Sequence, residues 1–562
     1  YYTRSRKIPW LAKEAFETRD WPHAIELSQE RISIFSVSIS NAAPIITKMI
    51  GETDLIDGFW DTVEEHYQSL ISERYEADLA LAYLASMRRR TYQNIWNPIG
   101  SGLYGKTEIG ADFLCHFTAS GEMTPELVQL ILAVPGIKAP FRDLPSDAVR
   151  VSERMNTELQ IGLDRPLERI EVVNAGFFRN RGAYIVGSVR VAGEDGPLAL
   201  ALLHREDGIE VDAVILRETT LRHIFSSTLA NQHVTVNRYH ELVEYLHGLM
   251  PVRPRGMHYS TIGYNHVGKL AVMEQITTGL DVHNEALDDA PGPPGSVAIG
   301  FTSPSTEYVL KIIRDKPTKH YKWGEFHGKE SVLAKYHGVH EKNRSGSMLD
   351  NVIYSNLWLP RKMFKPALLD EILQEASDSV SLSDDDVFFS HLIVQRKLVP
   401  VPLYLQNCTR EEAEMVVIRL GQCIRNNAAT NVFNRDLDGR NYGVSSLRFV
   451  YLFDYDAVEV LTDVKVRTNT DLVDGEEGIP DWYFEDGVVF LPEEIEAHLR
   501  LPDKELRRLF REAHGEMLTV DYWTRMQRLL KEGYVPRVRT YPRSTQLIQE
   551  GAEGNLTLSP QR

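Results

Sequence analysis

Residues 290–316 read APGPPGSVAIGFTSPSTEYVLKIIRDK. A turn rich in proline and glycine comes first, and the alternating apolar residues after it predict a pair of strands. Alternation along the second strand places Val309, Lys311 and Ile313 on one face. An ammonium group among such neighbours needs an anionic partner, because a buried unpaired charge is costly. The phosphate of a nucleotide would supply this partner, and an edge-strand lysine that reaches water is the alternative.

The turn before these strands is a candidate phosphate-binding loop. Glycine lets the backbone approach a ligand closely, and backbone N–H groups can donate hydrogen bonds to phosphate oxygens. The loop is not of the G-x-x-x-x-G-K-[ST] type, because Phe301 follows Gly300 where that motif has lysine. From the turn alone, an ordinary structural hairpin stays open as the alternative.

A second group of polar residues lies at 431–456, which read NVFNRDLDGRNYGVSSLRFVYLFDYD. Asp436 and Asn441 have the D-x-x-x-x-N spacing of the catalytic loop in protein kinases, and Asp454 follows beyond a predicted hairpin. Phosphoryl transfer needs one carboxylate to orient the attacking hydroxyl and two oxygen ligands to hold Mg²⁺ on the phosphates. Asp436 is therefore the candidate base, and Asn441 and Asp454 are the candidate metal ligands.

The segment between these two groups, FFSHLIVQRKLVPVPLYL at 388–405, predicts a strand followed by a connecting hinge. Leu398 and Val399 in the hinge are apolar enough to line a slot for an adenine ring. An ordinary core strand is the alternative that the pattern leaves open.

Length and charge narrow the classes of protein that fit. The chain has 562 residues, too many for one core, which suggests about two to four domains. Its formal net charge of −17 opposes the phosphate backbone of nucleic acids, so no nucleic-acid partner is predicted. Cys115, Cys408 and Cys423 are too few and too scattered for a disulfide framework, which favours a reducing cytoplasm.

The apolar runs are short. Stretches such as PLALALL at 197–203 fall far below the roughly 20 residues that span a bilayer, so the sequence predicts no transmembrane helix and no membrane partner. The chain begins YYTRSRK, without methionine or an apolar signal sequence, and we expect a short native beginning to be missing.

The periodicity of apolar residues and a linker-like segment divide the chain into two parts. The first 160 or so residues are mainly helical in pattern, as where Trp60, Val63, Tyr67 and Leu70 recur on one helix face. Short β-rich runs between about 170 and 225 predict a small sheet attached to these helices. The acidic and then proline-rich segment DVHNEALDDAPGPPG has the composition of a linker and places a domain boundary near 285.

Together these motifs resemble those of one family, the bifunctional isocitrate dehydrogenase kinase/phosphatases. The nucleotide loop of that family has the form A-P-G-x-x-G, which Ala290 to Gly295 match, although Ser296 replaces the usual methionine. Further matches are the K-D-K-like Arg314-Asp315-Lys316, E-x-x-R-x-G-x-M-x-D at Glu341 to Asp350, Val399-Pro400, the loop from Asn431 to Val444, and Asp454-Tyr455-Asp456. Asn434-Arg435 stand where the family has Pro-Gly before the catalytic aspartate.

The resemblance implies an enzyme that phosphorylates a serine of isocitrate dehydrogenase with ATP and removes that phosphate again, with ADP, at one site that binds Mg²⁺ or Mn²⁺. These reactions direct carbon between the citric acid cycle and the glyoxylate bypass. Lys311 would hold the ATP phosphates, Asp436 would be the kinase base, Asn441 and Asp454 would bind metal, and Asp350 would serve dephosphorylation. The remaining implied nucleotide-binding residues form the loop Ala290, Pro291, Gly292, Pro293, Pro294, Gly295 and Ser296.

The resemblance also implies an α+β architecture. We expect a mainly helical regulatory domain with a small sheet at 1–285, followed by a bilobal protein-kinase-like domain at 286–562. Its small lobe would cover about 286–400 and its large lobe about 401–562. By the same resemblance the regulatory domain binds AMP or another metabolite effector, and the protein forms a homodimer in the cytoplasm.

Several alternatives stay open at this point. Asp350 could simply cap the element that follows it, and Glu330 is a candidate partner for Lys311 by position. The histidines at 320, 327, 337 and 340 raise the alternative of a metal hydrolase, although their spacing is not H-E-x-x-H. A serine kinase acting on another protein, or a nucleotide-sensing pseudokinase scaffold, would share the same motifs.

Overall fold

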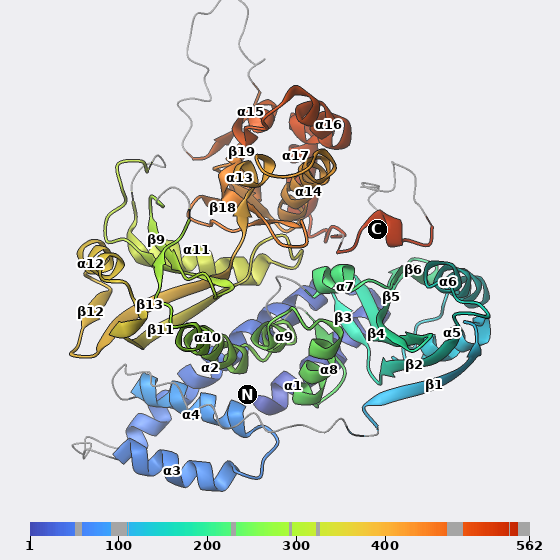
Figure 1. The fold of residues 1–562 in the computed structure, drawn as a ribbon, viewed down its shortest axis with the longest axis horizontal. Coiled ribbons are helices and arrows are strands. Elements are labelled where there is room, and N and C mark those ends of the chain that lie inside the picture. Colours follow the sequence, from blue (N-terminus) through green and yellow to red (C-terminus); the bar gives the residue numbers. More distant parts are fainter. Residues whose placement is uncertain are drawn as a thin grey trace, which may run out of the picture.

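The computed structural model describes residues 1–50, 59–91, 110, 112–225, 232–291, 295–321, 326–468, 487–538 and 540–548. Helices and two large sheets alternate along the chain, so the prediction of an α+β fold is confirmed at that level. Figure 1 shows one sheet on the right, the other on the left, helices between and below them, and the C-terminal helices above. The second sheet and the C-terminal part position the candidate site described below.

The chain begins with helices. They are α1 (Tyr2–Thr18), α2 (Trp21–Ile50), α3 (Phe59–Ile71) and α4 (Ala77–Thr91). Helix α3 matches the predicted periodicity, and Trp60 is buried, but Leu70 at the other end of the expected apolar face is 66% exposed. The apolar face is therefore shorter than its spacing suggested.

Helix α2 bears on the prediction that the chain has no helix able to span a membrane. Among the described residues it is the single helix that is long and apolar enough to cross a bilayer, judged by length and composition alone. The stretch was missed because serine, threonine and asparagine interrupt its apolar residues. Its Phe35, Ile39 and Ala43 belong to the core under the first sheet, which is also what a packing helix of a globular protein would show.

The first sheet has seven strands and is antiparallel throughout. Its strands are β1 (Leu114–Gly121), β2 (Leu167–Val173), β3 (Phe177–Arg179), β4 (Gly182–Val191), β5 (Glu194–Arg205), β6 (Gly208–Ile215) and β7 (His233–Val234). It begins at Leu114, ahead of the predicted β-rich segment, because β1 pairs with β2 across two intervening helices. Its central strands β4 and β5 are buried on both faces over most of their length, so they read as apolar runs rather than as alternating patterns.

Helices cover both faces of this sheet. One core joins the sheet to α1, α5 (Pro125–Ala133) and α6 (Leu144–Glu158). The other joins it to α2, α7 (Glu218–Ile224) and α8 (Tyr239–Leu249). Helices α9 (Arg255–Thr261) and α10 (Asn265–His283) then lead toward the second sheet, where α10 shares a core with its strands.

The second sheet carries Lys311. Its order is β11-β13-β10-β9-β8, with β12 beside β13. The strands are β8 (Asp288–Asp289), β9 (Ala298–Thr302), β10 (Tyr308–Ile313), β11 (Asn351–Pro360), β12 (Val380–Leu382) and β13 (Asp386–Arg396). Lys311 pairs with Gly300 on β9 and with Ile393 on β13, so β10 is interior and the edge-strand alternative is wrong. Helices α11 (Gly328–Lys342) and α12 (Pro366–Glu375) pack on opposite faces.

The C-terminal part is helical around small β-pairs. Its helices are α13 (Val401–Leu405), α14 (Arg410–Ala429), α15 (Ile495–Leu499), α16 (Lys504–His514) and α17 (Val520–Lys531). Its strands are β14 (Val399–Pro400), β15 (Val432–Asn434), β16 (Tyr442–Val444), β17 (Val450–Leu452), β18 (Val458–Val460), β19 (Lys465–Val466) and β20 (Val489–Phe490). Helix α14 is fixed at its start by a capping box of Thr409 and Glu412.

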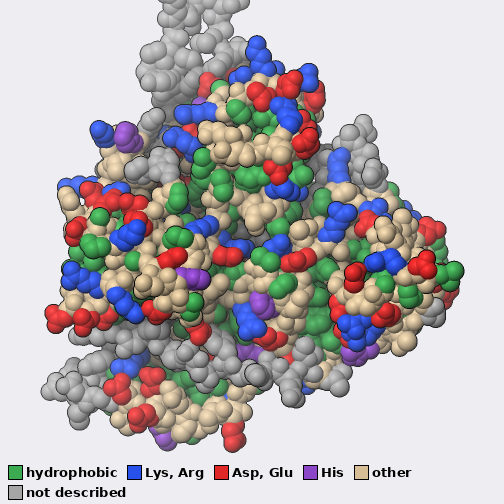
Figure 2. Space-filling model, in the orientation of Figure 1, with side chains coloured by type: hydrophobic (Ala, Val, Ile, Leu, Met, Phe, Trp, Pro, Cys, Tyr) green, Lys and Arg blue, Asp and Glu red, His purple; other side chains and the backbone are tan. Residues whose placement is uncertain are grey.

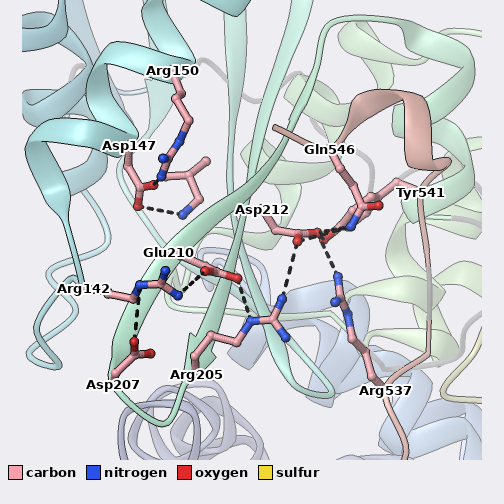
Figure 3. A network of polar contacts seen from close by, with 11 residues as sticks. Arg142, Asp147, Arg150, Arg205, Asp207, Glu210, Asp212, Arg537, Tyr541 and Gln546 are labelled. Atoms are coloured by element: carbon pink, nitrogen blue, oxygen red, sulfur yellow. Dashed lines mark hydrogen bonds and ion pairs between the residues drawn. The ribbon is translucent and has the colours of Figure 1, made fainter. Parts of the chain in front are cut away.

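After α17 the chain returns to the first sheet (Figures 1 and 3). The carboxylate of Asp212 on β6 accepts hydrogen bonds from Arg537, Tyr541 and Gln546, and the Asp212 carbonyl accepts one from the N–H of Leu547. Asp212 is buried, so these contacts replace its lost hydration. These contacts join the first sheet to the segment that follows α17. We call them the clasp, and define it as Asp212 with Arg537, Tyr541, Gln546 and Leu547.

Candidate functional site

Lys311 lies at the boundary between the second sheet and the C-terminal part. Its Nζ donates a hydrogen bond to the backbone carbonyl of Phe453 at 3.3 Å. The ammonium also lies over two aromatic rings, 5.2 Å from the centroid of Phe453 and 5.9 Å from that of Tyr336. Burial lowers the pKa of Lys311, and the nearby carboxylates of Asp454 and Asp456 oppose that shift. A single cation is thus enclosed beside two acids.

The loop after β15 places Asp436 and Asn441. The Oδ1 of Asn434 accepts from the N–H of Asp436, while the amide nitrogens of Asn434 and Asn441 both donate to the Asp436 carbonyl. Asn434, a departure from the family's Pro-Gly, therefore builds a side-chain turn that holds the aspartate. Because the amide nitrogen of Asn441 is engaged, its oxygen is the atom that can serve as a metal ligand.

A short hairpin brings Asp454 back to this loop, as the spacing predicted. Strand β16 pairs with β17, with Tyr442 opposite Leu452, and the N–H of Phe453 donates to the carbonyl of Asn441 at 3.1 Å. Asp454 therefore follows directly on a residue that is bonded to Asn441. The two predicted metal ligands and the predicted phosphate-binding lysine all meet around Phe453.

Asp456 joins this group and was absent from the residues chosen by spacing. Its pKa is raised to about 7, mainly by burial and then by the charges of Asp454 and Asp436, against which Lys311 and Lys335 act. The Nζ of Lys335 also donates to the Asp456 carbonyl at 2.8 Å. The signal was available in the sequence, since Asp456 is the second acid of Asp-Tyr-Asp. Three carboxylates thus share one electrostatic environment that a divalent cation would neutralise.

Helix α11 contributes a tyrosine to the site. The hydroxyl of Tyr336 donates to Oδ1 of Asp454 at 3.3 Å, and burial raises the pKa of this tyrosine well above its usual value. Glu330, the partner considered for Lys311, is exposed in the first turn of α11, and its charge acts on His391. In this structure the carboxylates that act on Lys311 are therefore Asp454 and Asp456.

The glycine-rich turn lies between β8 and β9. The N–H of Ala290 donates to the carbonyl of Gly300, and a Cβ at Gly295 would stand 2.4 Å from the carbonyl oxygen of Ala298, so glycine is required there. Ser296 accepts a hydrogen bond from the N–H of Thr318 through its carbonyl. Of the predicted loop residues, Pro291 is exposed, while Gly292, Pro293 and Pro294 lie outside the described residues.

The hinge segment lies beside the hairpin. Val399 pairs with Val444, and a Cβ on Gly443 would stand 2.5 Å from the Cβ of Leu398. Leu398 therefore packs against the strand that follows Asn441, while Val399 is 42% exposed. These residues form an apolar surface next to Phe453, as an adenine slot would require. The adenine slot stays a prediction.

Asp350 occupies a neighbouring place. It is buried and immediately precedes β11, so the interpretation as a helix cap is wrong because the next element is a strand. The N–H of Leu349 donates to the carbonyl of Leu452, which sets this segment beside β17. Asp350 lines a cavity of about 420 Å³ together with Arg253 and Lys397. Burial raises the pKa of Tyr455 well above its usual value, and the charges of Asp350 and Asp454 add to this shift.

The histidines of the metal-hydrolase alternative do not converge. The Nε2 of His340 is 3.1 Å from Oδ1 of Asn351, and burial lowers the pKa of His340 to about 4, while His337 is exposed. Within the described part of the chain, no group of three or more histidine, cysteine, aspartate or glutamate side chains could hold a metal ion. A pair of protein ligands completed by phosphate oxygens, as Asn441 and Asp454 would offer, is a different kind of site.

One further glycine motif occurs earlier in the chain. Residues 100–107 read GSGLYGKT, which has the G-x-x-x-x-G-K-[ST] spacing of loops that join a strand to a following helix. The nearest described elements are α4, which ends at Thr91, and β1, which begins at Leu114. Residues 92–109 themselves lie outside the described part of the chain.

Comparison with known proteins relates this geometry to one family. The family model described as the isocitrate dehydrogenase kinase/phosphatase (AceK) kinase domain matches residues 285–543, and the model of the regulatory domain matches residues 1–284. The isocitrate dehydrogenase kinase/phosphatase of Rhodopseudomonas palustris strain TIE-1 is 46% identical, covering 97% of this chain and 90% of that protein. That of Anaeromyxobacter sp. strain Fw109-5 is 28% identical over 98% of this chain and 96% of its own length. The resemblance predicted from the motifs is confirmed, and it extends over the N-terminal half.

Proposed function

The chain belongs to the isocitrate dehydrogenase kinase/phosphatase family, and from this premise we propose the reaction that its cleft performs. It phosphorylates a serine of isocitrate dehydrogenase with ATP and dephosphorylates the same serine, at one nucleotide site. The protein is thus both a phosphotransferase and a phosphoprotein phosphatase. Through these reactions it sets the flux between the citric acid cycle and the glyoxylate bypass.

One observation supports this proposal above the others. The ammonium of Lys311 and the carboxylates of Asp436, Asp454 and Asp456 act on one another electrostatically around the backbone of Phe453. The charges of Lys311 and Lys335 do not balance these three acids, and the negative charge that remains fits a divalent metal carried on a nucleotide. When bound, ATP supplies the phosphoryl group, and Mg²⁺ or Mn²⁺ neutralises the charge on its phosphates.

In the kinase direction each residue has one task. Asn441 and Asp454 would hold the metal through oxygen atoms, and Lys311 would orient the phosphates by its charge. Asp436 accepts the proton of the substrate serine hydroxyl as the serine oxygen bonds to the γ-phosphorus, and the bond from that phosphorus to the bridging oxygen breaks and releases ADP. The hydrogen bonds from Asn434 and Asn441 to its backbone fix this aspartate before the substrate arrives, so little ordering remains to be done.

In the phosphatase direction a water molecule attacks the phosphorus of phosphoserine, and the serine oxygen leaves with a proton. We propose that Asp350 orients this water, because it is a buried carboxylate beside β17, the strand that leads to Asp454. ADP occupies the nucleotide site in this direction. Two acids therefore act in one cleft: Asp436 in phosphorylation and Asp350 in dephosphorylation.

The same premise extends to the architecture and the partners. Residues 1–285 form the regulatory domain and 286–562 the kinase-like domain, with a small lobe to about 400 and a large lobe beyond it. The loop Ala290 to Ser296 covers the nucleotide phosphates.

AMP or another metabolite acts on the regulatory domain, and the enzyme is a cytoplasmic homodimer. Isocitrate dehydrogenase docks by geometry rather than by bulk charge, since acidic and basic side chains are interspersed on the face in Figure 2.

A coupled assay tests the proposal. Purified isocitrate dehydrogenase is incubated with this protein, ATP and Mg²⁺, and its activity should fall as label from radioactive ATP appears on serine. Replacing ATP with ADP should then restore the activity and release the label. Transfer to other proteins but not to isocitrate dehydrogenase would identify a serine kinase of different specificity. Nucleotide binding with no transfer to any protein would identify a pseudokinase scaffold.

A further inference from the structure

The cavity of about 420 Å³ that Asp350 lines joins the two halves of the chain. Its lining includes Arg222 on α7 and Arg253 just before α9, both from the half that carries the first sheet. The turn between β9 and β10 and the hairpin loop between β16 and β17 supply further walls. Figure 1 shows α9 between the two sheets. Asp350 therefore borders a space whose walls come from both halves of the chain.

Arg253 has a fixed position at this cavity. It is buried, and its Nη2 donates to the carbonyl of Met257 at 3.2 Å and to Oγ1 of Thr261 at 2.7 Å. Oγ1 of Thr261 in turn donates to the carbonyl of Phe225 at 3.2 Å. Both contacts of the guanidinium use neutral acceptors, and its Nε has no hydrogen-bond partner among the described residues. These contacts place the cation but leave its charge uncompensated.

Two other cations of the cavity have carboxylate partners of their own. The Nε of Arg222 lies 3.4 Å from a carboxylate oxygen of Glu218. The Nη2 of Arg396 lies 3.0 Å from a carboxylate oxygen of Glu307. Neither cation therefore depends on Asp350 for compensation of its charge.

The charge of Asp350 acts on Arg253. Burial lowers the pKa of Arg253 to about 10, and the charge of Asp350 opposes this shift. Burial also lowers the pKa of Arg179 on β3, with the charge of Asp350 among those that oppose it. Arg179, however, does not line the cavity, and its guanidinium donates to the carbonyls of Ile224 and Arg344. Arg253 is thus the buried cation that shares both a space and an electrostatic interaction with Asp350.

We propose that Arg253 is a positioning residue of the phosphatase reaction, whose charge orients the carboxylate of Asp350 toward the attacking water. The inference rests on the proposed function, which gives Asp350 this task. In that step the water oxygen bonds to phosphorus and the bond from phosphorus to the serine oxygen breaks. Asp350 receives one proton of the water, and the serine oxygen takes up a proton as inorganic phosphate leaves.

This arrangement gives the two halves of the chain a shared task. Arg253 belongs to the part that matches the regulatory-domain model, whereas Asp350 belongs to the part that matches the kinase-domain model. A cation held in place by its own contacts fixes the direction of the carboxylate before the substrate arrives. The regulatory domain then takes part in dephosphorylation and not in phosphorylation.

Arg253→Met tests the inference, because it keeps the apolar length of the side chain and removes the charge. The kcat for dephosphorylation should fall about tenfold or more, while KM for phosphorylated isocitrate dehydrogenase stays within about twofold, since Arg253 acts through Asp350. The kinase kcat should also stay within about twofold, because neither Asp436 nor Lys311 lines this cavity. Arg253→Lys keeps the charge without the planar fork, so its phosphatase rate should lie between the other two.

Two comparisons separate positioning from a general structural effect. Arg222→Met is the matched control, because Arg222 lines the same cavity and has Glu218 as its partner. Its ratio of phosphatase to kinase activity should equal that of the unmodified protein. In Arg253→Ala, millimolar methylguanidinium chloride should restore phosphatase activity, and sodium chloride at the same ionic strength should not.

Melting temperatures of Arg253→Met, Asp350→Ala and the double variant complete the test. Each single substitution leaves a buried charge without its partner, so the double variant should lose less than the sum of the single losses. Additive losses, or an unchanged ratio of phosphatase to kinase activity in both Arg253→Met and Arg253→Lys, would overturn the inference. If the unmodified protein releases no label from phosphorylated isocitrate dehydrogenase, the proposed function fails instead, and the melting temperatures still decide whether Arg253 and Asp350 are coupled.

Discussion

Lys311 donates a hydrogen bond to the backbone carbonyl of Phe453, which lies 142 residues further along the chain. This contact joins the interior strand of the second sheet to the hairpin that carries Asp454. It places the ammonium against the carboxylates by backbone geometry rather than by a side-chain ion pair alone. The positions of the charges are therefore fixed before a nucleotide enters the cleft.

Replacing Lys311 by methionine tests the shared site. Lys311→Met keeps the length and apolar contacts of the side chain but removes its charge, so both kinase and phosphatase rates should fall about 100-fold or more. The thermal midpoint should fall, because Asp454 and Asp456 lose the cation that compensates their charge. Rates are measured with isocitrate dehydrogenase in the presence of ATP or ADP. Loss of only one activity would mean that the two reactions use separate nucleotide sites.

Asp350 should separate the two activities. Asp350→Ala should lose phosphatase activity while substantial kinase activity remains, because Asp436 and the metal ligands belong to a different group of contacts. Asp436→Asn provides the opposite case, with kinase activity lost first. Both variants are assayed for label transfer and label release on the same preparation of substrate. Equal loss of the two activities in Asp350→Ala would contradict this division of roles.

Much of the second sheet and its cleft could be predicted from the sequence because local patterns encode it. The alternation of residues around Lys311 predicted strand β10 and the face on which the lysine lies. The spacing of Asp436, Asn441 and Asp454 predicted the loop and the hairpin that bring these residues together. These residues are close in sequence or lie on strands whose period is two. Only the resemblance, and no pattern, singled out Asp350 for chemistry.

Other features could not be predicted because they arise from distant contacts. The clasp at Asp212 pairs a strand residue with side chains more than 300 positions later, and its residues show no local periodicity. A cavity of about 380 Å³ likewise unites α2, α4, α10 and β11, although its Arg89 and Lys269 look like ordinary surface residues in the sequence. Leu70 was assigned to a buried face by spacing, but nothing in its own helix indicates whether a partner covers it.

A stacked pair links the N-terminal half to the hairpin and should respond to pH. The rings of His223 and Phe449 lie 3.7 Å apart and nearly parallel, with Arg419 on Phe449 at 4.1 Å. Burial, and then the charges of Arg419 and Arg179, lower the pKa of His223 to about 3. A lowered pKa means that neutral His223 stabilises the fold above about pH 6.5, and that this contribution is lost as the pH falls toward 3.

His223→Phe should keep the stack and remove its titration. The midpoint of the unmodified protein should therefore fall more between pH 7 and pH 5 than that of His223→Phe, when both are measured by calorimetry. Other buried histidines, such as His233 and His258, titrate in both proteins and cancel in this comparison. Identical pH profiles for the two proteins would show that His223 is not held neutral by the fold.

The clasp makes a prediction about stability with an internal control. Asp212→Ala leaves Arg537, Tyr541 and Gln546 without their shared acceptor in a buried place, so the free energy of unfolding should fall by about 2–4 kcal/mol. Asp207, close by in Figure 3, contacts Arg142 with a side chain that is 60% exposed. Its replacement by alanine should change the free energy by less than about 1 kcal/mol.

Urea denaturation of the two clasp variants gives these free energies, and limited proteolysis reports where the chain opens. Release of the clasp should expose the segment after α17 and make cleavage near residues 535–547 faster in Asp212→Ala than in Asp207→Ala. The physical reason is that Asp212 holds Arg537, Tyr541 and Gln546 together, whereas the contacts that remain are those of Thr540 and Tyr541 with Tyr184 and the backbone contacts of Gln546 and Leu547. Equal stability and equal cleavage in both variants would mean that the clasp adds nothing beyond an exposed ion pair.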